Sequence, residues 1–184
     1  MAVRSSMADL IARVRLLLFD PAGSATFADQ EIQDTLDQRR EFVRYAPLRP
    51  EATPQPATGV MQYLDYFATR GFWENDAALY GPAWQPLSPA TSDTLTGHWT
   101  FASSQLPTVW IVGKRYDVYG AAADLCEIWA AKTADQFDFT DINARYQRSQ
   151  IGEAKLRLAA AYRAQAWTFT AEMAREDVER GQGL

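Results

Sequence analysis

The chain has 184 residues, of which 47% are hydrophobic and 22% charged, and its formal net charge is −5. This length and composition are typical of one folded domain and exclude an intrinsically disordered chain. The acidic balance disfavours binding to nucleic-acid phosphates. Cys126 is the only cysteine, so no disulfide can form within the chain, and a reducing compartment is expected.

The N-terminal 45 residues predict two helices in a hairpin. The first is expected over residues 7–19, with Leu10, Val14, Leu17 and Leu18 on its apolar face, and Asp20 to Gly23 ends it. Arg13 and Arg15 interrupt its apolar run, which argues against a signal peptide, and the start of translation is left open between Met1 and Met7. The second helix is expected from Asp29 to about residue 45, where Ile32, Leu36 and Val43 would form its buried face.

Residues 46–113 predict a small antiparallel β insertion. The segment contains most of the prolines and tryptophans and has no helical periodicity. Short β-prone runs cover residues 61–68, 84–87, 95–102 and 108–112, and turn residues separate them. Residues 49–59 are expected to be an exposed connection.

Residues 114–168 predict a second helical hairpin, formed by helices over 114–134 and 149–168. The expected fold is therefore α+β: mainly an α-helical bundle of four helices, in the order α-α-β-α-α, with a small antiparallel β insertion between helices 2 and 3. The whole chain, 1–184, is expected to be one domain, and residues 169–184 a partner-binding tail. The expected core of the bundle consists of Leu10, Val14, Ile32, Leu36, Val118, Leu125, Trp129, Leu156 and Tyr162.

A search for chemistry finds no convincing site. His98 is the sole histidine, and nothing in the sequence arranges a nucleophile or further metal ligands around it. Cys126 lies in an alanine-rich helix and is interpreted as a small apolar residue. Asp65, Glu74 and Asp76 accompany several aromatic residues, and this pattern keeps open a carbohydrate-binding or hydrolytic module. We expect no enzyme activity, cofactor or metal.

Several segments together resemble the head–tail connector proteins of tailed phages, which are the adaptor or head-completion proteins beneath the portal. YDVYGAAADLCEIWAAK (116–132), FDFTD (137–141), RSQ (148–150) and LAAAYRAQAW (158–167) are similar to their C-terminal half. DLIARVRLLLFDPAGSATFADQEIQDTLDQ (9–38) is similar to their start. The β insertion lies outside the resemblance.

The resemblance implies a structural virion protein of the phage neck, made in the host cytoplasm. It would form a ring of twelve copies under the portal protein, contact the next neck or tail-completion protein, and let DNA pass through the lumen without specific binding. No membrane is involved. The C-terminal segment would contact the portal through Trp167, Phe169, Met173 and Val178. The alternatives are the carbohydrate-binding or hydrolytic module, and another neck component such as a tail-completion protein.

Overall fold

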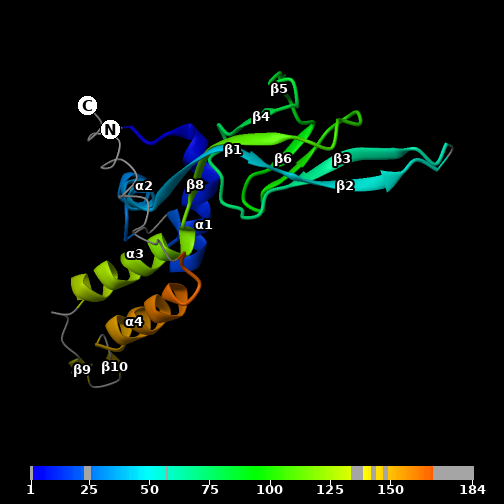
Figure 1. The fold of residues 1–184 in the computed structure, drawn as a ribbon. Coiled ribbons are helices and arrows are strands. Elements are labelled where there is room, and N and C mark those ends of the chain that lie inside the picture. The colour runs from blue at the N-terminus through cyan, green and yellow to red at the C-terminus, as the bar shows by residue number, and fades with distance from the viewer. Residues whose placement is uncertain are drawn as a thin grey trace, which may run out of the picture.

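The computed structural model describes residues 2–22, 26–56, 58–133, 139–141, 144–146 and 149–167 (Figure 1). The helices are the 3₁₀ turn η1 (Ser5–Met7), α1 (Ala8–Leu18), α2 (Asp29–Gln38), α3 (Val118–Thr133) and α4 (Ser149–Arg163). The strands are β1 (Arg40–Pro47), β2 (Arg49–Pro54), β3 (Met61–Phe67), β4 (Ala78–Tyr80), β5 (Pro86–Leu87), β6 (Thr91–Asp93), β7 (His98–Thr100), β8 (Trp110–Tyr116), β9 (Phe139–Asp141) and β10 (Ala144–Tyr146). No helix within the described residues is long and apolar enough to cross a membrane.

The prediction of a mainly helical bundle with a small β insertion is wrong. Two four-stranded antiparallel sheets, in the orders β1-β8-β4-β5 and β2-β3-β7-β6, stand beside the four helices and have a hydrophobic core of their own. Both sheets lie between residues 40 and 116. They take residues 40–45 from the predicted second helix and residues 114–116 from the predicted third helix.

Alternation of side chains explains this difference. Along β1, Glu41 and Val43 are partly buried while Phe42 and Arg44 are exposed, which is the period of a strand. The aromatic and β-branched residues in this segment also favour extended backbone over helix. Val43 fits the helical spacing from Leu36 only by coincidence, since α2 ends at Gln38.

The helices share one hydrophobic core. Leu10, Val14, Ile32, Leu36, Val118, Leu125 and Tyr162 are all buried in it, and Trp129 packs partly buried against it. Leu156 is 52% exposed, so its expected place in the core is wrong: it faces outward on α4, whose contact with the core runs through Ala159 and Tyr162. Lys155 Nζ and the Tyr162 hydroxyl donate to the carbonyls of Leu18 and Leu17, at 2.7 Å each, and so fasten α4 to the end of α1.

A second hydrophobic core lies between the two sheets. Trp73, Leu79 and Ile111 contribute from the side of β4 and β8, and Tyr66, Trp99 and Phe101 from the side of β3 and β7. The rings of Trp73 and Trp99 meet edge to face, with centroids 6.2 Å apart. The β region is therefore a two-layer unit with its own core. An aromatic core or interface was expected for the β insertion, whereas its two layers were not.

The hairpin β2–β3 projects from the body, away from the helices (Figure 1). Residues 49–54 pair with residues 61–67, although residues 49–59 were predicted to be an exposed connection and not part of a sheet. β7 pairs only with Asp65 to Phe67 of β3. In the outer part of β3, which begins at Met61, the ladder continues with β2 and not with β7. We call residues 53–61 the arm tip.

Candidate interaction surface

Four aromatic side chains gather on the outer face of the sheet β1-β8-β4-β5. Tyr45 comes from the bulge of β1, Tyr80 from β4 and Trp110 from β8, where it pairs with Tyr80, while Trp84 lies on the turn before β5. Tyr45 meets Trp84 and Tyr80 edge to face, with centroids 4.9 and 6.1 Å apart, and Trp84 stacks on Trp110 at 6.0 Å. We call these four residues the aromatic patch.

The aromatic patch faces solvent. Tyr45 is 50% and Trp84 56% exposed, and Tyr45, Tyr80 and Trp84 enclose an open hollow of about 250 Å³. Large aromatic side chains that cluster in the open are typical of binding surfaces rather than of a monomer's ordinary exterior.

Backbone strain supports the same interpretation. Tyr45 and Trp84 have φ angles of 51° and 58°, which lie in the left-handed region that costs a non-glycine residue about 1–2 kcal/mol. Strain of this kind persists where the surrounding structure requires a particular side-chain direction. Here it turns two rings outward into the same patch.

A basic residue, Arg44, precedes Tyr45 of the patch in β1. Phe42 is 52% exposed, and the Arg44 guanidinium carbon lies 5.5 Å over its ring. Arg44 forms no ion pair with any residue that the structure describes. The surface is thus apolar at its centre and cationic beside it.

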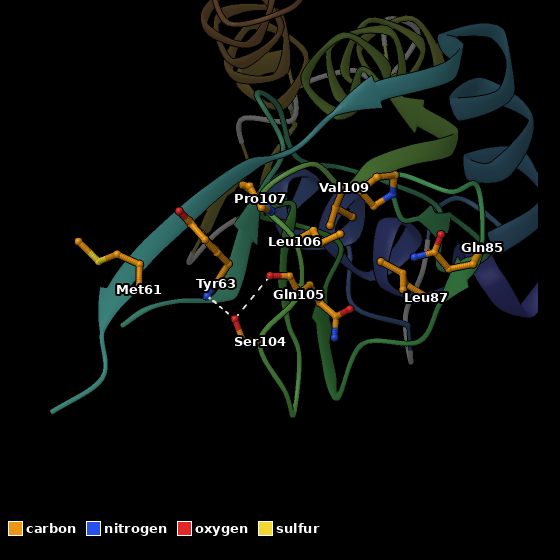
Figure 2. Close-up of a pocket in the computed structure, with 10 residues that line it drawn as sticks. Met61, Tyr63, Gln85, Leu87, Ser104, Gln105, Leu106, Pro107 and Val109 are labelled. Atoms are coloured by element: carbon orange, nitrogen blue, oxygen red, sulfur yellow. Dashed lines mark hydrogen bonds between the residues drawn. The ribbon is translucent and has the colours of Figure 1, made fainter. Parts of the chain in front are cut away.

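A second hollow, of about 480 Å³, lies at the root of the arm (Figure 2). Figure 2 shows Met61 and Tyr63 on one side, Gln85 and Leu87 on the other, and Leu106 between them. The Tyr63 amide donates to Ser104 Oγ at 3.0 Å, which holds the loop after β7 against the arm. The turn 81–85 borders both hollows, since Gln85 lines this one and Trp84 lines the hollow of the aromatic patch.

The carboxylates considered from the sequence do not form a catalytic pair. Glu74 is buried and accepts hydrogen bonds from Ser6, Arg4, Tyr116 and Lys114, at 2.6 to 3.2 Å. Burial raises its pKa, but the donors Ser6, Tyr116 and Lys114 and the charge of Arg4 outweigh it and lower the pKa to about 2. A carboxyl group with this pKa is ionised near neutral pH and has no proton to donate as a general acid. Its four hydrogen bonds instead hold the surrounding segments together. Asp76 has one of its oxygens 3.3 Å from Lys114 Nζ and is half exposed.

His98 and Asp65 meet on the other sheet, together with Thr100. Asp65 Oδ1 lies 2.8 Å from His98 Nε2 and accepts a hydrogen bond of 2.6 Å from the Thr100 hydroxyl. Hydrogen bonds from Thr100 and then His98 lower the pKa of Asp65. A hydrolytic triad needs its carboxylate and its nucleophile at opposite ring nitrogens, whereas both groups here approach Nε2.

Cys126 is fully buried in the helical core, and burial raises the pKa of its thiol. This environment disfavours the thiolate and thus nucleophilic chemistry. Among the described residues, no three His, Cys, Asp or Glu side chains are grouped so that they could hold a metal ion.

Trp167 is the one expected portal-contacting residue that the structure describes. Its amide donates to Asp117 Oδ2 at 3.2 Å, and its ring lies between the guanidinium groups of Arg70 and Arg115, at 5.3 and 5.1 Å. The start of the C-terminal segment is thereby fixed beside the first turn of α3. Phe169, Met173 and Val178 lie outside the described residues.

Reasoning from the sequence missed the aromatic patch because its members are scattered over residues 45 to 110. Proximity of Tyr45 to Trp84 depends on the pairing of β1, β8 and β4, and the first of these strands was predicted to be a helix. Arg4 and Ser6 were also missed, since residues 1–6 show no periodic pattern.

No protein-family model, curated protein or solved structure matches the chain.

Proposed function

We propose that the protein is a structural component of a tailed-phage neck, a head–tail connector that docks beneath the portal. Copies of the chain associate side to side in a ring with the portal's twelve-fold symmetry, the ring extends the DNA channel, and its far side meets the next neck protein. The proposal starts from the resemblance of residues 9–38 and 116–167 to such connectors.

The observation that carries the proposal is the exposed aromatic patch. Its four rings belong to a surface that needs a partner to bury it, and a chain with an assembly role supplies such partners. The projecting β2–β3 arm adds a second surface with exposed apolar side chains, at Val60 and Met61. Both features favour an assembly protein over a self-contained enzyme.

The portal contact is assigned to the C-terminal segment, with Phe169, Met173 and Val178 as apolar anchors. Trp167 holds the beginning of that segment against the body through Asp117, Arg70 and Arg115. Trp167 therefore positions the segment, and the residues that follow it make the contact.

The test is co-expression with the portal protein encoded in the same genome, followed by low-resolution electron microscopy of the purified complex. We expect the full chain to form a ring on the portal and a chain ending at Thr168 to remain folded but unbound. If the full chain leaves the portal bare, the connector function is wrong. If the shortened chain docks equally well, only the assignment of the portal contact is wrong.

Carbohydrate binding is the second candidate, and the same patch favours it, because exposed Trp and Tyr rings also stack on sugar faces. A glycan array probed with the unchanged chain and with Trp84→Ala separates the two functions. Glycan binding that Trp84→Ala abolishes would support this candidate, and an array without signal would eliminate it.

A further inference from the structure

The arm tip exposes apolar side chains that its own chain leaves uncovered. Val60 is 61% and Met61 53% exposed, and Pro54 and Pro56 beside them are exposed as well. The Gln55 amide donates to the Val60 carbonyl at 2.9 Å, which ties the two strands together at this end of the hairpin, and Gly59 takes a φ of 67°. A two-stranded ribbon is marginally stable alone, so a projecting ribbon with an apolar end is suited to burial against another surface.

The aromatic patch has the complementary chemistry. Its hollow is open and lined by three rings, and prolyl rings and a methionine thioether pack favourably on aromatic faces. The charges also match: Glu51 is the only charged residue between Pro50 and Leu64, and Arg44 precedes Tyr45 of the patch. An arm lying across the patch would bring these opposite charges together.

Within one chain the two surfaces do not meet, since the side chains of the arm tip and of the aromatic patch are both exposed to solvent. β1, which carries Tyr45, is joined to β2 through Leu48 alone, and the arm runs outward from that point (Figure 1). Leu48 is buried and its amide donates to the Val109 carbonyl at 2.8 Å, which fixes the direction in which the arm leaves. The exposed arm tip is thus available to the patch of another copy.

We propose that the arm tip of one copy docks on the aromatic patch of a second copy. The contact joins two different surfaces, so it is heterologous and closes into a ring when the rotation between copies allows. This inference rests on the proposed assembly function and names the contact between neighbouring copies.

Cysteine cross-linking tests the contact directly. Cys126 is buried, so the unchanged chain gives a low background, and the double variant Thr53→Cys/Ala83→Cys places one thiol on the arm tip and one beside Trp84. Under oxidation we expect a ladder of dimers and larger species. Thr53→Cys/Ala160→Cys, whose second thiol lies on an exposed position of α4, is the matched control and should stay monomeric. Equal yields from both pairs would overturn the proposal.

Mixing two defective variants gives a second, independent test. Tyr45→Ala/Trp84→Ala removes the patch, and Val60→Ser/Met61→Ser removes the apolar tip; all four side chains are at least half exposed, so both variants should fold, which circular dichroism checks. Each variant alone should self-associate at least tenfold more weakly than the unchanged chain. An equimolar mixture should form dimers and nothing larger, because only one intact tip and one intact patch remain per pair.

Phe19→Ala tests whether the loss of any exposed aromatic side chain weakens association. Phe19 is 74% exposed at the end of α1 and far from the patch in the sequence. This variant should associate as the unchanged chain does. If both defective variants still form full rings on the portal, the arm contact is wrong and the connector function stands. If the unchanged chain neither self-associates nor binds the portal, both proposals fail.

Discussion

Four donors converge on the buried carboxylate of Glu74, and they come from two segments that are far apart in the sequence. Ser6 and Arg4 precede α1, while Lys114 and Tyr116 belong to β8. Arg4 also binds Asp37 of α2 with hydrogen bonds of 2.7 and 3.0 Å. The single ionised side chain at position 74 therefore links the N-terminal segment, the helices and the β region.

The lowered pKa of Glu74 predicts an acid-dependent stability. Because the pKa is about 2 in the folded protein against an ordinary value of 4.5, the contribution is complete above pH 4.5 and is lost as the pH falls towards 2. It amounts to about 3 kcal/mol. Urea unfolding at several pH values should show Glu74→Gln less stable than the unchanged chain at neutral pH, with the difference closing below about pH 3.

The matched control is Asp76→Asn, which removes a half-exposed partner of the same Lys114. A partly exposed ion pair contributes about 0–1 kcal/mol, so this variant should follow the unchanged chain across the pH range. A Glu74→Gln variant with the same pH dependence as the unchanged chain would contradict the assigned role.

Among the elements, α3 depends on one residue that the sequence pattern did not reveal. Asp117 directly follows β8, and its Oδ1 accepts from the Gly120 amide at 3.0 Å, which caps the first turn of α3. Its Oδ2 accepts from the Trp167 amide and lies 3.7 Å from Arg39. Gly120 is needed here because a Cβ at that position would collide with the Asp117 carboxylate and with Arg39.

Asp117→Ala should therefore destabilise the protein through α3 and release the segment after α4. The lost cap costs about 1–2 kcal/mol, and a buried Arg39 contact is lost in addition. Asp117→Asn keeps an oxygen for the cap, so its stability should lie between that of the unchanged chain and that of Asp117→Ala. Thermal unfolding gives the order, and hydrogen exchange at Trp167 should accelerate in Asp117→Ala; unchanged exchange there would refute the link to the C-terminal segment.

The elements that could be predicted from the sequence are those whose pattern is local. α1 was expected over residues 7–19 and occupies Ala8–Leu18, because its apolar face, Leu10 to Leu18, follows the helical period without interruption. β3 was similarly expected over 61–68 and spans Met61–Phe67. At these positions local propensity and tertiary packing agree.

The start of β8 was expected within the run 108–112. β1 and residues 113–116 of β8 could not be predicted in the same way, since their stability comes from pairing with each other across about 70 residues of sequence. Arg40 pairs with Tyr116 and Val43 with Gly113, and no local signal reports such partners. The same non-local pairing creates the aromatic patch, so fold and candidate surface were missed for one reason. By contrast, the absence of a cysteine nucleophile at Cys126 followed from its apolar neighbours.

At the scale of the whole molecule, two hydrophobic cores are joined by the cluster around Glu74. The helical core contains Cys126, and Trp129 packs against it, while the sheet core contains Trp73 and Trp99. Thiol reactivity therefore reports on the helical half, and tryptophan fluorescence reports on the sheet half once Trp129 is replaced by Phe. Arg4 connects them, because it binds both Asp37 and Glu74. Cooperative unfolding of the two halves depends on such connections.

A chain that begins at Met7 should uncouple the two cores. It lacks Arg4 and Ser6 and leaves Glu74 with two of its four donors, which should cost about 2–4 kcal/mol. In urea and in a Trp129→Phe background, Cys126 labelling and tryptophan fluorescence should share one midpoint in the full chain and separate in the shortened one. A chain lacking only residues 1–3 is the control, and a single shared midpoint in both chains would show that the cores are coupled elsewhere.

The buried position of Leu48 has a mechanical consequence. β1 and β2 follow one another along nearly the same line in Figure 1 and are joined only through Leu48, so a force that pulls on the arm acts along the axis of β1. The hydrogen bonds between β1 and β8 lie across that axis and are loaded together in shear, instead of opening one after another. The arm is thus attached in the geometry that best resists extension, as a tether under tension requires.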